Sequence, residues 1–358
     1  MKKIIVIINW LRKGGAENNT VKIVNHLAIN NDVTLVVLSD KYDDLRGSIV
    51  SDVDVIFGIS IIKLFFLYLK EMSKADIIFS SDHRIATYLM LFRLLIPIKK
   101  PSFWCRSINN LTMLLGRKSI LIKSLVKMTM SRQDVVIAQC AAMQKDLVVN
   151  WGVQEERCIV VYNPISNMAS FDYSRSIVSN EDSNFIFLFI GRFSRQKRIP
   201  LMIESFAKAN LPQNARLYLV GYRDWMDSDR SELEAINRVA EHNHVTDRIT
   251  VFPWTPDSSD FLKLASCFLL TSEFEGFPNV LVEAISNGVP IVSVKCDFGP
   301  EEIINDTNGF LVDSSSADDI SLFIKDAYKK HWSPHKIHLT SLKFSEENQF
   351  SKIDKVIS

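Results

Sequence analysis

Residues 267–284 read CFLLTSEFEGFPNVLVEA and join a short apolar run to a second run with helical spacing. The run Cys267–Leu270 is typical of a strand that is buried on both faces. Pro278 fits the first position of a helix, and Gly288 with Pro290 fits its end. A buried strand that leads through a loop into a helix is the repeating unit of parallel α/β sheets, so this segment predicts an α/β fold.

The same alternation extends along the whole chain. Strands are predicted at Ile4–Ile8, Val33–Leu38, Asp76–Ser80 and Val135–Ala138, and again at Phe185–Ile190, Arg216–Val220, Ile249–Phe252, Cys267–Leu270 and Pro290–Val294. Helical spacing covers Ala16–Ala28 and Ile199–Ala209. Because aliphatic runs alternate with helices and the pattern restarts after residue 165, we expect two Rossmann-like domains, each a doubly wound parallel sheet.

The boundary between these domains is predicted in the polar stretch 167–183. Just before it, Pro164 favours an extended Asn163, as in a strand that leaves a domain. We therefore expect an N-terminal domain over 1–166 and a C-terminal domain over 167–340. The last segment, 341–358, is predicted to form a helix that packs back on the N-terminal domain.

Charge is distributed unevenly along the 358 residues, although 42 Lys and Arg nearly cancel 41 Asp and Glu. Residues 1–165 hold 22 basic and 14 acidic side chains, whereas 166–358 hold 20 and 27. The composition excludes disordered, collagen-like and coiled-coil chains, and the near-zero total argues against a nucleic-acid partner. The asymmetry indicates a surface or an anionic partner for the N-terminal half.

Cysteine usage and apolar runs bear on the compartment. Five scattered cysteines without a C-x-x-C pair predict reduced thiols in a cytosolic protein, with neither a disulfide framework nor a zinc site. The apolar run Ile4–Ile8 is too short for a signal peptide and lacks a cleavage site, so we interpret it as a strand. No run reaches the length of a spanning helix.

Two carboxylates stand out in the segment quoted first. Glu275 would lie in the loop at the carboxyl end of a parallel strand, where open α/β sheets bind ligands. Glu283 would share a helix face with Asn279, since residues i and i+4 are neighbours. Backbone N–H groups at the start of the helix can meet phosphate oxygens. Taken alone, the two carboxylates also fit an ordinary solvated helix end.

A cluster of cations follows another predicted strand. Residues 191–198 read GRFSRQKR, with four cations within seven residues. Arg offers a bidentate fork and Lys a point charge, so the cluster could hold a diphosphate; a solvated basic loop is the alternative.

Together these residues resemble the retaining glycosyltransferases of family four, which have the GT-B fold of two Rossmann-like domains that face a cleft. Glu275 and Glu283 match the family's E-x7-E signature, which encloses Gly276, Phe277 and Pro278. Its G-R-x4-K signature matches Gly191, Arg192 and Lys197. Further matches are 299–304, 308–312, the glycine-rich Gly14–Glu17 and Asn163-Pro164.

The resemblance implies roles for these positions. Arg192 and Lys197 would hold the donor's diphosphate and stabilise the leaving group, while Glu275 would accept hydrogen bonds from the transferred sugar and Glu283 would bind the ribose. The nucleotide-sugar site as a whole would comprise Gly15, Gly191, Arg192, Lys197, Glu275, Gly276, Phe277, Pro278, Asn279, Val280 and Glu283. The resemblance implies retention of configuration and no cofactor or metal, because Arg192 and Lys197 supply the countercharge. No D-x-D stands in the strand-end position that a metal-dependent transferase would use.

Acceptor contacts are expected in the N-terminal domain, from Gly14, His83, Arg106 and Asn109. Gly14-Gly15 also fits a simple tight turn, and His83 also fits an ordinary polar position. Many family members carry a histidine where this chain has 104–110, WCRSINN, so we expect Arg106 to replace it. The sequence also departs from the family at Tyr222-Arg223, which would narrow the loop that recognises the base.

The segment 84–132 holds ten basic residues and no acidic one. Large apolar residues interleave with them, and Leu114, Leu121, Leu125 and Met128 have helical spacing. This pattern is typical of an interfacial helix on anionic lipid, with Ile59–Leu69 as a second contact. A core-facing amphipathic helix is the alternative.

The sequence thus predicts an enzyme that moves a sugar from a nucleotide-sugar, UDP favoured over GDP, to a lipid-linked oligosaccharide. The setting would be O-antigen, capsule or exopolysaccharide assembly, in the cytoplasm and peripheral on the inner face of the membrane. The competing interpretation is a non-catalytic two-domain protein that binds sugars or nucleotides. A nicotinamide oxidoreductase is disfavoured because G-x-G-x-x-G is missing.

Overall fold

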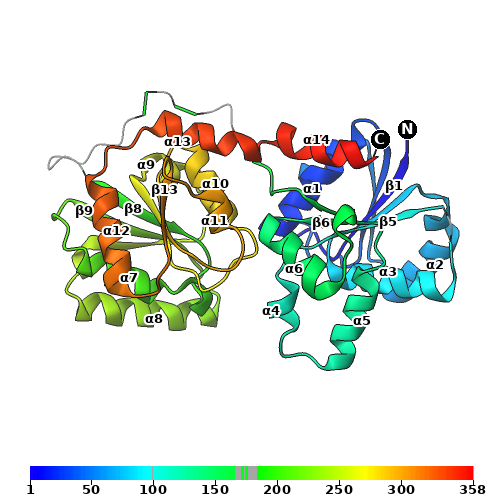
Figure 1. The fold of residues 1–358 in the computed structure, drawn as a ribbon, viewed down its shortest axis with the longest axis horizontal. Coiled ribbons are helices and arrows are strands. Elements are labelled where there is room, and N and C mark those ends of the chain that lie inside the picture. The colour runs from blue at the N-terminus through cyan, green and yellow to red at the C-terminus, as the bar shows by residue number, and fades with distance from the viewer. Residues whose placement is uncertain (99, 166–170, 173, 176–183, 358) are drawn as a thin grey trace. The chain divides into compact units, whose positions relative to one another are not determined.

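The computed structural model describes residues 1–98, 100–165, 171–172, 174–175 and 184–357. Contacts divide the chain into an N-terminal unit, 1–164 with 349–358, and a C-terminal unit, 165–348 (Figure 1). The predicted boundary, after residue 166, lies two residues beyond this division. Most of the polar stretch 167–183 lies outside the described residues.

The N-terminal unit contains a parallel sheet in the order β3-β2-β1-β4-β5-β6-β7. Its strands are β1 (Lys3–Ile8), β2 (Asp32–Val37), β3 (Val53–Phe57), β4 (Ile77–Ser80), β5 (Ser102–Arg106), β6 (Val135–Ala138) and β7 (Cys158–Val160). Its helices are α1 (Gly15–Ala28), α2 (Ile61–Lys70), α3 (His83–Leu95), α4 (Leu111–Leu115), α5 (Ile120–Met130) and α6 (Ala141–Trp151), with 3-10 turns η1 (Arg46–Ser48), η2 (Met72–Lys74) and η3 (Glu155–Arg157).

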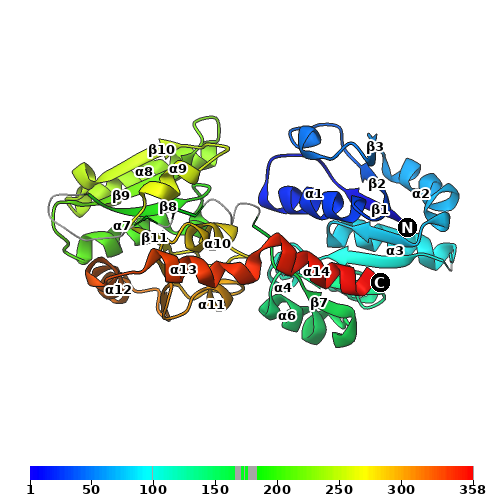
Figure 2. The ribbon, with the colours of Figure 1, turned by 90° about the horizontal axis from the view of Figure 1, so that it is seen from above.

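Both faces of this sheet are covered, which explains why its central strands are aliphatic throughout. Successive side chains of β1 point to opposite faces. Ile4, Val6 and Ile8 pack with α1 and with the end of α14 (Glu346–Ile357), whereas Ile5 and Ile7 pack with α2 and α3 (Figure 2). The residues of α14 from Gln349 onward belong to the N-terminal unit.

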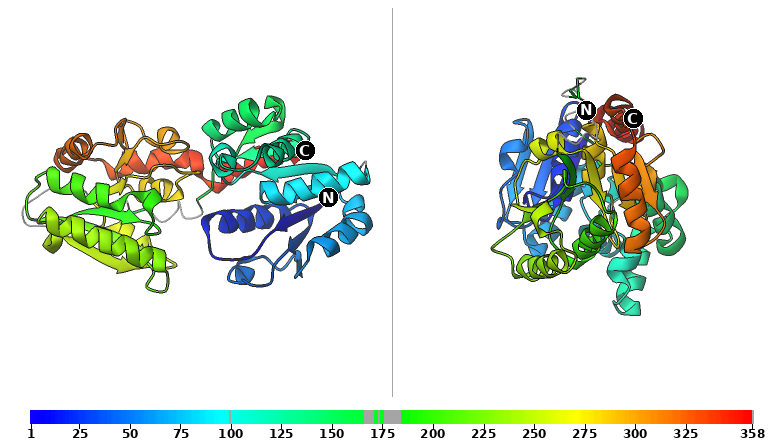
Figure 3. Two further views of the ribbon diagram at one scale, coloured as in Figure 1. Left: turned by 90° about the horizontal axis from the view of Figure 1, so that it is seen from below. Right: turned by 90° about the vertical axis from the view of Figure 1, so that its left-hand side faces the viewer.

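The C-terminal unit has a second parallel sheet, in the order β10-β9-β8-β11-β12-β13. Its strands are β8 (Phe185–Ile190), β9 (Ala215–Tyr222), β10 (Ile249–Pro253), β11 (Cys267–Leu270), β12 (Ile291–Val294) and β13 (Gly309–Val312). Its helices are α7 (Ile199–Lys208), α8 (Asp227–His242), α9 (Ser259–Leu264), α10 (Asn279–Ser286), α11 (Pro300–Ile303), α12 (Ala317–Lys329) and α13 (Pro334–Ser341), with turns η5 (Arg195–Lys197), η6 (Thr246–Arg248) and η7 (Leu342–Phe344). Helix α7 contacts both α8 and α12, and α10 contacts α13 (Figure 3).

Each sheet reverses its strand order at one point, between β1 and β4 and between β8 and β11. Open α/β sheets bind ligands beyond the carboxyl ends of the strands at such a point. The loops after these four strands carry most of the predicted site residues, so the topology brings them together in two groups, one in each unit.

Every predicted strand is present, but four strands were missed. Strand β3 is an edge strand in which Asp54 is exposed, β5 reads SFWCR, and β7 and β13 have only three and four residues. None of them forms a long aliphatic run. Helix α10 begins at Asn279, with Pro278 as its N-cap, one residue later than predicted.

We expect Gly221→Ala to destabilise the C-terminal unit by at least about 2 kcal/mol, because strained backbone adds to a steric clash. Gly221 has φ +123°, and a Cβ there would lie 2.2 Å from the carbonyl oxygen of Gly191. Thermal unfolding measures the loss. Gly47→Ala is the matched control, since nothing lies within 4 Å of its Cβ position. Equal melting temperatures for the two variants would contradict the close approach of the two loops.

Candidate functional site

The centre of the candidate site is a buried ion pair at the reversal point of the C-terminal sheet. Nζ of Lys197 lies 2.6 Å from Oε1 of Glu275, and the two side chains are only 13% and 9% exposed. Lys197 comes from the loop after β8 and Glu275 from the loop after β11. Two residues 78 positions apart thus meet where the order of strands reverses.

Hydrogen bonds hold these two loops in register. The backbone N–H of Glu273 donates to the Gln196 carbonyl at 2.8 Å, and the Gln196 amide donates to the Phe274 carbonyl at 2.6 Å. The Thr271 hydroxyl donates to the Lys197 carbonyl at 2.9 Å. The two loops that carry the ion pair are therefore fixed relative to each other by hydrogen bonds.

The four predicted cations of this loop have different environments. Arg198 has φ +48° and turns back to donate to the carbonyls of Thr271 and Ser272, so it braces the frame. Arg192 and Arg195 are exposed, and neither forms an ion pair within the described part of the chain. Hence Lys197, Arg192 and Arg195 remain the cations suited to a ligand, whereas Arg198 is structural.

Gly276, Phe277 and Pro278 form the turn between Glu275 and α10. Phe277 is buried and packs against Phe344 at 5.9 Å between ring centroids. Position 299 has room only for a glycine, because a Cβ there would lie 2.3 Å from Cδ of Pro278. This packing fixes the start of α10, and with it Asn279 and Val280.

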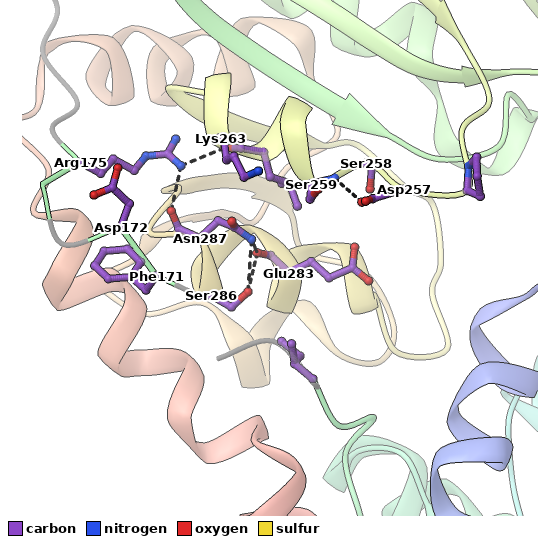
Figure 4. A pocket seen from close by; sticks show the side chains of 13 residues that line it. Phe171, Asp172, Arg175, Asp257, Ser258, Ser259, Lys263, Glu283, Ser286 and Asn287 are labelled. Carbon is purple, nitrogen blue, oxygen red and sulfur yellow. Dashed lines mark hydrogen bonds between the residues drawn. The ribbon is translucent and has the colours of Figure 1, made fainter. Parts of the chain in front are cut away.

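Glu283 lies elsewhere in the same unit, one helical turn after Asn279. It lines a pocket of about 660 Å³ together with Asp257, Ser258 and Ser259 (Figure 4). Figure 4 shows the Glu283 carboxylate directed toward this segment, while Arg175 lies at the other end of the pocket. Glu275 does not line this pocket, so the two predicted carboxylates occupy neighbouring but separate places.

The loop after β9 differs from the prediction. Arg223 donates from Nε and Nη2 to the two carboxylate oxygens of Asp229, at 2.9 and 2.7 Å. Burial alone would raise the pKa of Asp229, but the hydrogen bonds and charge of Arg223 outweigh it and hold that pKa below its ordinary value. Arg223 is therefore tied to α8 and does not project into the loop.

Sequence reasoning missed two exposed tryptophans beside this loop. Trp225 and Trp254 are 63% and 42% exposed and form an edge-on pair with centroids 6.4 Å apart. They follow β9 and β10, and their signal in the sequence was a large aromatic placed just beyond a strand end.

In the N-terminal unit, Gly14 is the N-cap of α1 and Gly15 its first residue. Asp82 caps α3 and accepts a hydrogen bond from the Asn9 amide. His83 follows it and is buried, and burial lowers its pKa, so its imidazole is neutral at physiological pH. Gly14 and His83 thus flank the reversal point between β1 and β4.

Arg106 does not occupy the place predicted for it. It is 1% exposed and donates to the Ala16 carbonyl at 3.2 Å, to the Thr20 hydroxyl at 3.4 Å and to the Asn163 side chain. Burial lowers the pKa of its guanidinium to about 10. Arg106 braces the start of α1 and does not face a ligand, whereas Asn109, three residues on, is exposed.

Among the described residues, no three His, Cys, Asp or Glu side chains gather as a metal site would require. Independence of metals and cofactors stays a prediction.

Comparison with known proteins points to one family. Residues 171–339, which lie in the C-terminal unit, match the family model "Glycosyl transferases group 1". The chain is 30% identical to the lipopolysaccharide 1,6-galactosyltransferase of Escherichia coli strain K12, over 60% of this chain and 58% of that enzyme. The chain thus spans little more than half the length of that relative.

Two further similarities extend over most of the chain. A Campylobacter jejuni enzyme, N-acetylgalactosamine-N,N'-diacetylbacillosaminyl-diphospho-undecaprenol 4-alpha-N-acetylgalactosaminyltransferase, is 23% identical over 87% of this chain and 86% of its own. Anabaena Alr3699/HepE, solved in complex with UDP and glucose, is 17% identical, with a TM-score of 0.80 over 100% of this chain and 99% of that one. The structural similarity and the two parallel sheets confirm the predicted GT-B fold of two Rossmann-like domains.

We predict that Arg106→Leu destabilises the N-terminal unit by about 1–3 kcal/mol, because it leaves buried acceptors unpaired. Urea unfolding measures the change. Arg117→Leu, at an exposed position, should stay within about 0.5 kcal/mol of wild type. An Arg106→Leu protein as stable as wild type would refute the bracing role.

Proposed function

We propose that this chain is a retaining glycosyltransferase that moves a sugar from a nucleotide-sugar to a lipid-linked glycan during bacterial polysaccharide assembly. The observation that carries the proposal is the buried Lys197–Glu275 pair at the reversal point of the C-terminal sheet, with Arg192 exposed in the same loop. A buried cation of this kind can neutralise a diphosphate without a metal.

Lys197 and Glu275 would exchange partners when the donor binds. In the structure each satisfies the charge of the other at 2.6 Å. A diphosphate offers Lys197 charge-assisted acceptors of the same class as the Glu275 carboxylate, and it carries more negative charge than one carboxylate. Glu275 is then free to accept hydrogen bonds from sugar hydroxyls, so donor binding and sugar orientation are coupled.

The reaction would keep the anomeric configuration through attack on the face of the departing phosphate. The acceptor hydroxyl oxygen bonds to the anomeric carbon, the bond from that carbon to the diphosphate oxygen breaks, and the hydroxyl proton passes to the leaving phosphate. Negative charge grows on that phosphate in the transition state. Lys197 and Arg192 would stabilise that charge, which would lower the barrier.

UDP is the favoured nucleotide. HepE, which shares the fold, was solved with UDP and glucose. In this chain Glu283 lines a pocket large enough for a nucleoside, about 660 Å³, in the same unit as the ion pair. We propose that Glu283 binds the ribose there.

We propose that the acceptor is lipid-linked. We also propose that the protein binds peripherally to the anionic inner face of the cytoplasmic membrane. Within the described residues no helix is both long and apolar enough to cross a membrane. The N-terminal unit, however, exposes many large apolar side chains on α2 to α5. They are Ile61, Ile62, Phe66, Leu69, Tyr88, Leu94, Leu95, Ile96, Met113, Leu114, Ile120, Leu121 and Ile122.

The structure narrows the basic part of this surface. Arg84, Arg93 and Lys100 pair with Asp82, Asp134 and Asp76, Arg106 is buried, and Lys99 lies outside the described residues. No described carboxylate pairs with the remaining five, which are Arg117, Lys118, Lys123, Lys127 and Arg132.

Leu114 lies on α4, whereas the apolar residues predicted to continue its spacing lie on α5, so two short helices replace the single predicted helix. The exposed tip Ile120–Ile122 with these cations fits lipid tails and anionic headgroups, each cation contributing about 1 kcal/mol.

We predict that UDP raises the melting temperature of the wild type, and that Arg192→Ala weakens this shift without lowering the melting temperature of the free protein. Lys197→Ala should abolish the shift but also destabilise the protein by about 3–5 kcal/mol, since it strands the Glu275 charge. Lys208→Ala, an exposed cation, is the control.

The same titrations with GDP test the base, and donor hydrolysis separates the enzyme from a non-catalytic binding protein. If no nucleoside diphosphate shifted the wild type, the transferase proposal would fail.

For the membrane, vesicle flotation should show binding to phosphatidylglycerol vesicles that decreases with salt. Replacing both Ile120 and Leu121 by Ser should abolish this vesicle binding. Serine in place of Leu264 and Leu322, which are 61% and 60% exposed in the C-terminal unit, should have no effect. Binding that ignores lipid charge and salt, or an equal effect of both double variants, would count against this surface.

A further inference from the structure

A second pocket lies in the N-terminal unit, and none of the four residues predicted for the acceptor lines it. It has a volume of about 490 Å³ and is lined by the segments that follow β1, β2 and β3. These are the carboxyl ends of three adjacent parallel strands, the edge at which such sheets bind ligands. Its walls include Trp10, Arg12, Lys41, Tyr42 and Ile61.

Backbone hydrogen bonds form this pocket in advance. The N–H of Ser39 donates to the Asn9 carbonyl at 2.8 Å, and the N–H of Leu11 donates to the Tyr42 carbonyl at 3.3 Å. The loops after β1 and β2 are thereby joined. Trp10 meets Tyr42 edge-on, with centroids 6.2 Å apart, and its indole N–H donates to Glu17 at 2.8 Å. The aromatic wall is therefore fixed before any ligand arrives.

Two exposed cations stand at this wall without a carboxylate. The Arg12 guanidinium and the Lys41 ammonium lie 5.3 and 5.4 Å from the centroid of the Tyr42 ring. Neither forms an ion pair with any carboxylate that the structure describes. Both are therefore available to an anionic ligand, and both approach the same ring.

The acidic side chains of these loops are directed to other groups. Asp44 accepts from the backbone N–H of Lys13, Asp43 lies 3.5 Å from Arg46, and the Asp40 carboxylate lies beside Gly58. None of the three lines the pocket, so the charged side chains of its lining are the two cations.

The pocket continues into an apolar surface. Ile59 and Ile61 form its third wall, and Ile61 begins α2, whose Ile62 and Phe66 are 71% and 63% exposed. A ligand that carries its charge at Arg12 and Lys41 can thus place an attached hydrocarbon along α2. Free phosphate or an unmodified sugar would leave this apolar wall in water.

We propose that this pocket binds the phosphate of a lipid-linked acceptor, as an isoprenoid diphosphate, with Arg12 and Lys41 on the phosphate and the chain along α2. The inference rests on the proposed function, since it names the acceptor's chemistry. It assigns to acceptor binding four residues with no such role so far: Trp10, Arg12, Lys41 and Tyr42.

The test uses farnesyl diphosphate as the probe, titrated by calorimetry into the full chain with UDP in excess to occupy the nucleotide site. Replacing Arg12 and Lys41 together by Ala should weaken binding at least about tenfold, since two charge-assisted contacts are lost. The control replaces Lys325 and Lys329 by Ala, removing the same charge from exposed positions of α12 in the C-terminal unit, and should stay within about twofold. Farnesol and inorganic pyrophosphate distinguish the lipid from the phosphate contribution.

Each outcome decides the matter. Tight binding of farnesyl diphosphate, weaker binding of both fragments and loss only in the Arg12/Lys41 variant support the proposal. Wild-type affinity in that variant, or equal loss in the control, overturns it. Pyrophosphate that binds as tightly as farnesyl diphosphate overturns the lipid-linked assignment. UDP binding is measured separately. If UDP did not bind, the proposed function would fail, whereas the effect of the Arg12/Lys41 variant on farnesyl diphosphate binding could still be interpreted.

Discussion

The contact between Lys197 and Glu275 is the constraint on which the C-terminal unit depends. A charge buried without a partner costs several kcal/mol, so the loops after β8 and β11 must meet closely enough for the pair to form. Gly221, Arg198 and Gly299 adopt unusual backbone conformations around this meeting point. Strained backbone persists where the surroundings over-determine it, and such places are commonly ligand sites.

The arginines of this chain illustrate how one residue type serves different ends. Arg106 and Arg198 donate mainly to carbonyl and side-chain oxygens and hold loops in place, whereas Arg192 and Arg12 remain exposed. A guanidinium with five donors can satisfy several carbonyls at once, which makes it a good brace. Lysine is a compact point charge, and Lys197 brings that charge to the Glu275 carboxylate.

The positive N-terminal half acquires a different meaning in three dimensions. In the sequence, the segment 84–132 contains no acidic residue. In the folded structure, however, Asp76, Asp82 and Asp134, which lie outside this segment, pair with three of its cations. The charge left over is concentrated on α5 and the loop before it, next to exposed apolar side chains. A surface with both features suits an interface between water and lipid better than a general anion site.

The sequence by itself determined the wholly apolar strands, such as Cys267–Leu270, and the two-domain α/β class, because these depend on local composition and spacing. It also held the two separate signatures that contain Glu275 and Lys197, but not the contact between them. It did not reveal β5, whose SFWCR lacks an aliphatic run, or the inward direction of Arg106, or the pairing of Arg223 with Asp229. Only the tertiary structure decided those, because whether a charged side chain points to solvent or to a buried acceptor depends on which distant carbonyls and carboxylates the fold brings within hydrogen-bonding distance.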